Sequence, residues 1–143
     1  MICREIIETL PEDAESGDRD IDWVEIDWPQ TLRRALRLVS NAGKRVDVLL
    51  PPGGRLRHGD VLFSFHNTLI AVFLRPCDVM ALRPPDKETS VRLALRLGNL
   101  HLSAEVEGEI IYTPVDGPAQ ALADALEVPF SHQRRRFFPD VSL

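Results

Sequence analysis

The sequence has few cysteines, no long apolar run and no excess of positive charge. Its two cysteines, Cys3 and Cys77, stand far apart, so neither a disulfide framework nor a zinc cluster is indicated. No window approaches the roughly 20 apolar residues of a membrane span, and the first ten residues lack the apolar core of a leader, so we expect a cytoplasmic protein. The formal net charge of −5 argues against binding to nucleic acid or to an anionic membrane.

The chain is nevertheless rich enough in apolar residues to fold. Its 143 residues are 44% apolar and 27% charged, which suits one ordinary domain or two small ones. Carboxylates crowd the segment Pro11–Asp22, and we expect this segment to be a solvated loop because such charge density resists burial. There is no nucleophile–base pair or glycine-rich phosphate signature in the first half, so we do not expect an enzyme.

Short strands dominate the first half of the sequence. Residues Met1–Leu10 suit an edge strand or a short helix equally. Alternating or continuous apolar residues predict strands at Val24–Trp28, Arg45–Leu50, Val61–Phe65 and Leu69–Phe73, the last two flanking a turn at His66-Asn67. The segment Thr31–Val39 fits either a helix or a strand that enters a turn, and its local pattern favours the helix. Together these elements predict a small β-domain.

The second half has a different order of elements. A strand at Val79–Leu82 precedes a helix at Lys87–Leu97, two strands, a second helix that begins at Asp116, and a last strand that begins at Val128–Phe130. This is the β-α-β-β-α-β order. Beyond the last strand, Arg134–Arg136 is expected to lead into a frayed tail.

Both predicted helices carry an apolar stripe. The first is expected to pack through Val91, Ala94, Leu95 and Gly98 and to end at Gly98-Asn99, with Gly98 supplying a positive-φ cap. The second places Ala119, Leu122, Ala123 and Leu126 on one face. The end of the first helix therefore holds the next polar side chain, His101, at a defined position.

The motif Leu97-Gly98-Asn99-Leu100-His101 makes the chain resemble the UreE family of urease accessory proteins, which are nickel metallochaperones with Leu-Gly-Asn-Arg-His at this point. Weaker matches in the same order support the resemblance: Asp27-Trp28, Gly59-Asp60-Val61-Leu62, Glu109-Ile110-Ile111-Tyr112 and Val128-Pro129-Phe130. It implies an α+β fold with a protein-binding β-domain over residues 1–75 and a ferredoxin-like, metal-binding and dimerising domain over residues 76–143. It also implies a strand over Leu36–Ser40, against the helical interpretation.

The implied function is delivery of Ni²⁺ to apo-urease, together with other urease accessory proteins, by a homodimer. A two-fold axis brings His101 of both copies together, so two imidazoles would bind one Ni²⁺, and Zn²⁺ or Cu²⁺ could occupy the same site. His132, expected in the flexible tail, is a candidate for a further ligand. His58 and His66 are expected to be solvated turn residues, and Cys77 to be packed.

Other interpretations remain open on the sequence. A lone histidine after a helix is most often structural, and Leu100 stands where the family has arginine, while the His-rich segments of some relatives are absent. The chain could therefore be a protein scaffold of urease maturation with little metal transport of its own. RNA binding by the ferredoxin-like half would need stacking aromatics on its central strands, where only Tyr112 is available.

Overall fold

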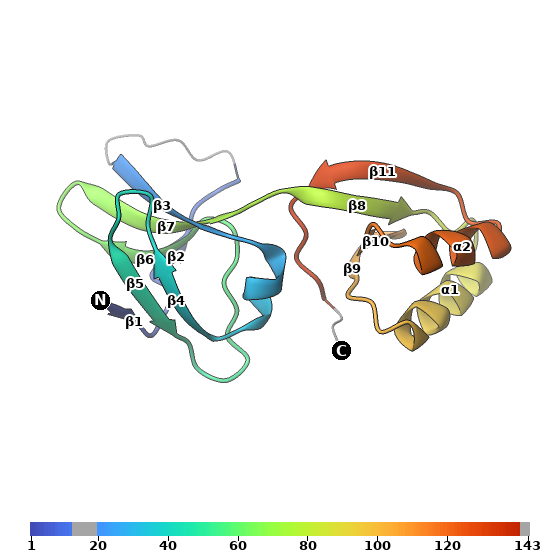
Figure 1. The fold of residues 1–143 in the computed structure, drawn as a ribbon, viewed down its shortest axis with the longest axis horizontal. Helices are drawn as coiled ribbons and strands as arrows, with labels where there is room; N and C mark the ends of the chain where they lie inside the picture. Colours follow the sequence, from blue (N-terminus) through green and yellow to red (C-terminus); the bar gives the residue numbers. More distant parts are fainter. Residues whose placement is uncertain (13–19, 141–143) are drawn as a thin grey trace. The chain divides into compact units, whose positions relative to one another are not determined.

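In the computed structural model, which describes residues 1–12 and 20–140, the chain divides into two units, Met1–Arg75 and Pro76–Leu143 (Figure 1). Each unit has its own sheets and its own buried apolar cluster. No helix among the described residues has the length and apolar character needed to cross a membrane.

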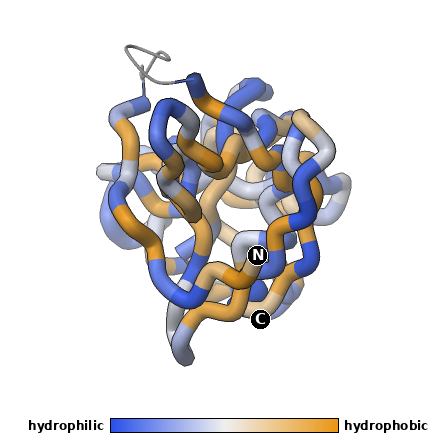
Figure 2. The backbone as a smooth tube through the Cα atoms, turned by 90° about the vertical axis from the view of Figure 1, so that its left-hand side faces the viewer, coloured by the Kyte–Doolittle hydropathy of each residue, from blue (hydrophilic) through white to orange (hydrophobic). Residues whose placement is uncertain are grey.

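Two sheets pack together in the N-terminal unit. Their hydrogen-bonded orders are β1-β5-β4 and β2-β6-β7-β3. The core contains inward side chains of both sheets. Burial alternates along β3, β4 and β5, whereas consecutive residues are buried in β6 and β7. Figure 2 shows the alternation of hydrophobic and hydrophilic residues near the N-terminus. The elements are β1 (Ile2–Cys3), β2 (Glu8–Thr9), β3 (Asp20–Ile26), a 3₁₀ helix (Trp28–Leu32), β4 (Ala35–Val39), β5 (Arg45–Leu49), β6 (Asp60–Ser64) and β7 (Thr68–Leu74).

The ambiguous segment Thr31–Val39 is largely a strand, so the helical interpretation of its local pattern is wrong. In β4, Leu36 and Leu38 are buried while Ala35, Arg37 and Val39 are exposed, and the strand pairs with β5. Pairing decides the outcome because a strand obtains its hydrogen bonds from a neighbour that a local pattern does not contain. Similarly, the predicted strand Val24–Trp28 ends at Ile26, and Trp28 begins the 3₁₀ helix.

The acidic segment Pro11–Asp22 was expected to be a solvated loop, and this is wrong for its last residues. Asp20–Asp22 belong to β3, and Asp22 is only 9% exposed. Its carboxylate accepts hydrogen bonds from the Ser40 hydroxyl at 2.6 Å and from the Ala42 N–H at 3.0 Å. These bonds offset the cost of burying a polar group. Residues 13–19 lie outside the described part of the chain.

The C-terminal unit has the predicted β-α-β-β-α-β order and an antiparallel sheet with strand order β11-β8-β10-β9. Both helices pack on the same face of this sheet, against Met80, Leu82 and Ile111 (Figure 1). The α+β class with a ferredoxin-like second half is thus confirmed. The elements are β8 (Cys77–Leu82), α1 (Lys87–Asn99), β9 (Glu105–Glu107), β10 (Ile110–Pro114), α2 (Gly117–Ala125) and β11 (Phe130–Arg135).

Helix α1 faces the sheet with a different stripe from the predicted one. Leu93 and Leu97 are 0% and 3% exposed, whereas Val91 and Leu95 are 54% and 68% exposed. Both pairs have i, i+4 spacing, so the pattern alone favours neither, and the sheet selects the pair that faces it. For α2 the prediction holds: Ala119 and Ala123 are buried, with Leu122 and Leu126 packed beside them.

Candidate functional site

The candidate site lies at the end of α1, and the helix is well anchored at its beginning. The Asp86 carboxylate accepts the Thr89 N–H at 2.7 Å, which is an N-cap. Hydrogen bonds from the Thr89 backbone and then from its side chain lower the pKa of Asp86 below its usual value. The anion also interacts favourably with the helix N-terminus. The first turn of α1 is capped and its side chains Leu93 and Leu97 are buried. These contacts fix the position of the helix and therefore of its last turn, which precedes His101.

His101 terminates this helix in an unusual backbone conformation. The His101 N–H donates to the Gly98 carbonyl at 3.0 Å, and the Leu102 N–H reaches the Leu97 carbonyl at 3.5 Å, the double bonding of a Schellman motif. In this motif the first residue after the C-cap adopts a left-handed backbone conformation. That residue is His101, which has φ = 56°. The predicted cap is therefore wrong in detail, because His101 and not Gly98 supplies the positive φ.

A left-handed histidine is a costly choice for this position. Glycine adopts the conformation without strain, whereas an L side chain costs about 1–2 kcal/mol. Glu127 adopts the same conformation at the end of α2, with φ = 54°, so the backbone strain by itself does not single out His101. The His101 side chain is exposed at the helix end, so its imidazole is accessible to a ligand.

The chain after β11 secures the strand that follows His101. The Asp140 N–H donates to the Ala104 carbonyl at 2.8 Å, and the Asp140 carboxylate accepts the Val106 N–H at 2.7 Å. The Phe138 N–H donates to the Glu105 carboxylate at 2.8 Å. We call residues 136–140 the C-terminal strap. It holds the chain where the His101 loop enters β9.

Arg135 and Phe137 reinforce the strap. The Arg135 guanidinium bonds to Glu105 at 3.2 Å and to Glu107 at 3.0 Å, and it lies 3.8 Å from the centre of the Tyr112 ring. Phe137 is fully buried. The prediction of a frayed tail from Arg134 is therefore wrong. The apolar pair Phe137-Phe138 was the available signal, since a frayed tail has no reason to carry two adjacent aromatic residues.

His132 does not lie in a tail. It occupies β11, opposite Met80 of β8, where backbone pairing fixes its position. Its exposed side chain lines a shallow depression with Asp78, Val115 and Arg134. The strand β11 and the strand β9, into which the His101 loop leads, are opposite edges of the sheet, about 14 Å apart at three strand spacings. Within one chain the structure therefore does not bring His101 and His132 together.

The remaining histidines and cysteines differ in their surroundings. His66 is exposed in the bend between β6 and β7, as expected, and Cys77 is partly buried. His58 is not a solvated turn residue as predicted: its ring stacks on Trp23 with centroids 5.9 Å apart, and its Nδ1 accepts the Leu74 N–H at 3.2 Å. Cys3 is buried, which raises the pKa of its thiol. Within residues 1–12 and 20–140, no three His, Cys, Asp or Glu side chains are grouped to hold one metal ion.

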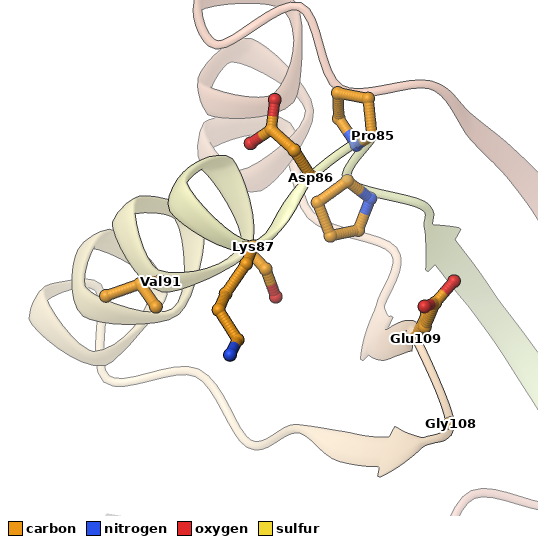
Figure 3. Close-up of a pocket in the computed structure, with 8 residues that line it drawn as sticks. Pro85, Asp86, Lys87, Val91, Gly108 and Glu109 are labelled. Atoms are coloured by element: carbon orange, nitrogen blue, oxygen red, sulfur yellow. The ribbon is translucent and has the colours of Figure 1, made fainter.

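A pocket at the opposite end of α1 has a different chemical character (Figure 3). Lys87 extends from the first turn of the helix toward the turn that contains Gly108 and Glu109, while the capping Asp86 is directed away. The remaining lining residues are Pro84, Pro85, Ser90 and Val91. This lining has no imidazole or thiol, so the pocket is unsuited to nickel, and the accessible imidazole of His101 is the stronger candidate.

Nearly the whole chain is similar to one family of known proteins. Residues 4–75 match the model of the N-terminal domain of the UreE urease accessory protein, and residues 77–142 match that of its C-terminal domain. The urease accessory protein UreE of Halalkalibacterium halodurans is 29% identical over 125 residues, covering 87% of this chain and 84% of that protein.

Two further urease accessory proteins are similar to most of this chain. The urease accessory protein UreE of Lysinibacillus sphaericus is 25% identical over 137 residues, which cover 96% of this chain and 93% of the relative. That of Actinobacillus pleuropneumoniae is 32% identical over 121 residues, 82% of this chain and 65% of the relative.

Proposed function

Because the chain belongs to the UreE family of urease accessory proteins, we propose that it is a nickel carrier that binds Ni²⁺ through His101 and transfers it to apo-urease with other accessory proteins. The observation that carries this proposal is the exposed His101, held in a left-handed conformation at the end of a capped helix. The backbone at the helix end therefore fixes the position from which the imidazole reaches solvent.

One imidazole is a weak metal site, so the proposal includes a homodimer. At a two-fold interface a residue meets its own copy, and two His101 side chains then supply two nitrogen ligands for one ion. Imidazole binds nickel, copper and zinc, so Zn²⁺ and Cu²⁺ compete for the same ligands. A site with few protein ligands also releases its ion readily, which a carrier requires. In this arrangement His132 can contribute only from a neighbouring copy or from a separate weaker site, since β8 and β10 separate it from the His101 edge.

A second function is favoured by one observation: the described residues hold no group of three metal-ligating side chains. The protein would then be a scaffold of the urease maturation complex with little metal transport of its own. In both cases the site of action is the cytoplasm, where urease is assembled. The two functions differ in whether the purified protein takes up Ni²⁺ at micromolar concentrations.

Nickel titration by calorimetry tests the proposal, and the backbone of His101 indicates the best variant. His101→Asn removes the imidazole but retains a residue that tolerates the left-handed conformation, so the helix end should survive. His101→Ala removes both properties. The matched control is His66→Asn, the same chemical change at an exposed histidine of the N-terminal unit.

We expect about one Ni²⁺ per dimer for the wild type, and at least tenfold weaker binding for His101→Asn with an unchanged circular dichroism spectrum. His66→Asn should bind nickel nearly as the wild type does. Unaltered affinity and stoichiometry in His101→Asn would show that the ligand assignment is wrong. A wild type that takes up no Ni²⁺ but still associates with urease accessory proteins would favour the scaffold.

A further inference from the structure

One face of the N-terminal unit is unusual because large apolar side chains are exposed on it together with arginines. In the sheet β1-β5-β4, alternate residues are buried in the core, and the others point away from it. We call this second set, with Arg4 directly after β1, the outer face. Its residues are Ile2, Arg4, Ala35, Arg37, Val39, Arg45, Asp47 and Leu49.

The apolar part of the outer face is substantial. Ile2 is 56% exposed, Val39 is 64% exposed and Leu49 is 39% exposed. The sheet is mixed, since β1 is parallel to β5 and β4 is antiparallel to it. A sheet that covers a core on one side and meets solvent on the other usually carries polar residues on the solvent side. The strand register places Ile2 beside Asp47, so Leu49 lies diagonally across from Ile2, and both line a shallow depression with Ala35. Contiguous exposed apolar residues of this kind indicate a surface for another molecule.

The charge of the outer face is opposite to that of the chain. Three arginines and one aspartate give it a formal charge of +2, whereas the whole chain carries −5. Arg45 Nε lies 3.5 Å from Asp47 Oδ1, which accepts no hydrogen bond in the described part of the protein. Asp47 is the one carboxylate of this face, so Arg4 and Arg37 add positive charge that it does not balance. A local cationic surface on an anionic protein selects an acidic partner.

We propose that the outer face docks an acidic protein segment that also carries aliphatic side chains. Arginine forms bidentate hydrogen bonds with carboxylates, and the depression between Ile2 and Leu49 accepts an aliphatic side chain. Nucleic acid fits less well, because its phosphates make no use of the apolar residues. In an extended segment, side chains on one face repeat about every 7 Å, as they do along β5. This role concerns protein contact and is independent of nickel binding by His101.

The probe is a synthetic peptide in which every second residue is serine. The residues between the serines are alternately glutamate and leucine, so that these two lie on one face of the extended peptide. It is titrated into nitrogen-15-labelled full-length protein, and amide shifts locate the contact. Control peptides replace the glutamates by lysines or the leucines by serines. Single-stranded oligo-dT is a further ligand. Arg37→Glu and Leu49→Ser test the face, and Arg92→Glu and Leu95→Ser make the same changes at exposed positions of α1.

We expect shifts at β1, β4 and β5, binding that weakens with added salt, and a loss of affinity of about fivefold or more in Arg37→Glu and in Leu49→Ser. The α1 variants and the wild type should bind alike. The proposal is overturned if the shifts lie elsewhere, if the peptide does not bind, if Arg37→Glu binds equally well, or if the lysine peptide or oligo-dT binds as tightly. His101→Asn should give the wild-type result, so a failure of the nickel proposal is recognised separately.

Discussion

Replacing Phe137 by alanine should destabilise the C-terminal unit alone. Phe137 is 0% exposed and anchors the C-terminal strap that holds Ala104 and Val106. Removing a fully buried phenylalanine side chain costs about 3–5 kcal/mol. A domain of this size is stabilised by roughly 3–10 kcal/mol, so the loss is a large share of its stability. A unit this small has a urea m-value of about 1–2 kcal/mol/M, so we expect its urea midpoint to fall by about 1.5–5 M.

The distribution of probes allows the two units to be followed separately. Both tryptophans, Trp23 and Trp28, belong to the N-terminal unit, whereas both α-helices belong to the C-terminal unit. In Phe137→Ala, the transition followed by helical circular dichroism should shift, and the tryptophan fluorescence transition should stay in place. Phe138→Ala is the matched control, because its partly exposed ring contributes less burial. A loss below about 1 kcal/mol, or equal shifts of both signals, would refute the reasoning.

Two further predictions concern backbone conformation and acid stability. Gly59 has φ = +86°, and a Cβ there would lie 2.7 Å from the Leu10 carbonyl oxygen, so Gly59→Ala should destabilise the N-terminal unit by about 1–3 kcal/mol in urea unfolding followed by tryptophan fluorescence. An unchanged midpoint would contradict this. Because the hydrogen bonds from Thr89 lower the pKa of Asp86, its cap should stabilise α1 above the ordinary aspartate pKa and fail as pH falls through the lowered value. Asp86→Ala should lose this part of the acid dependence of the helical signal, and an unchanged acid profile would disprove it.

The structure also clarifies how the candidate site depends on distant parts of the chain. His101 follows α1 in sequence, but the path after it is held by residues near the other end of the C-terminal unit, through Asp140 and Glu105. If His101 binds nickel as proposed, a change in the strap should alter that binding without changing the ligand itself. Nickel titrations of strap variants should be compared with their unfolding curves for this reason.

The sequence by itself determined the order of the elements in the second half, the beginnings of both helices and the position of His101 directly after α1. These features depend on residues within a few positions of one another, such as Asp86 and Thr89, whose hydrogen bond needs no distant partner. Turn residues, apolar spacing and the motif ending in His101 were therefore sufficient to predict them, and the family resemblance corrected the one segment, Thr31–Val39, where local spacing favoured a helix.

Only the tertiary structure decided which apolar stripe of α1 is buried, that Asp22 is buried, and that His132 lies in a strand. Each outcome depends on a partner remote in the sequence: the sheet face that meets Leu93 and Leu97, the Ser40 hydroxyl, and the β8 backbone opposite His132. A local pattern states what a segment can form, and the free energy of long-range packing and hydrogen bonding selects among the possibilities. The left-handed conformation of His101 was missed for a local reason: glycine adopts a positive φ with less strain, and Gly98 lies only three residues earlier.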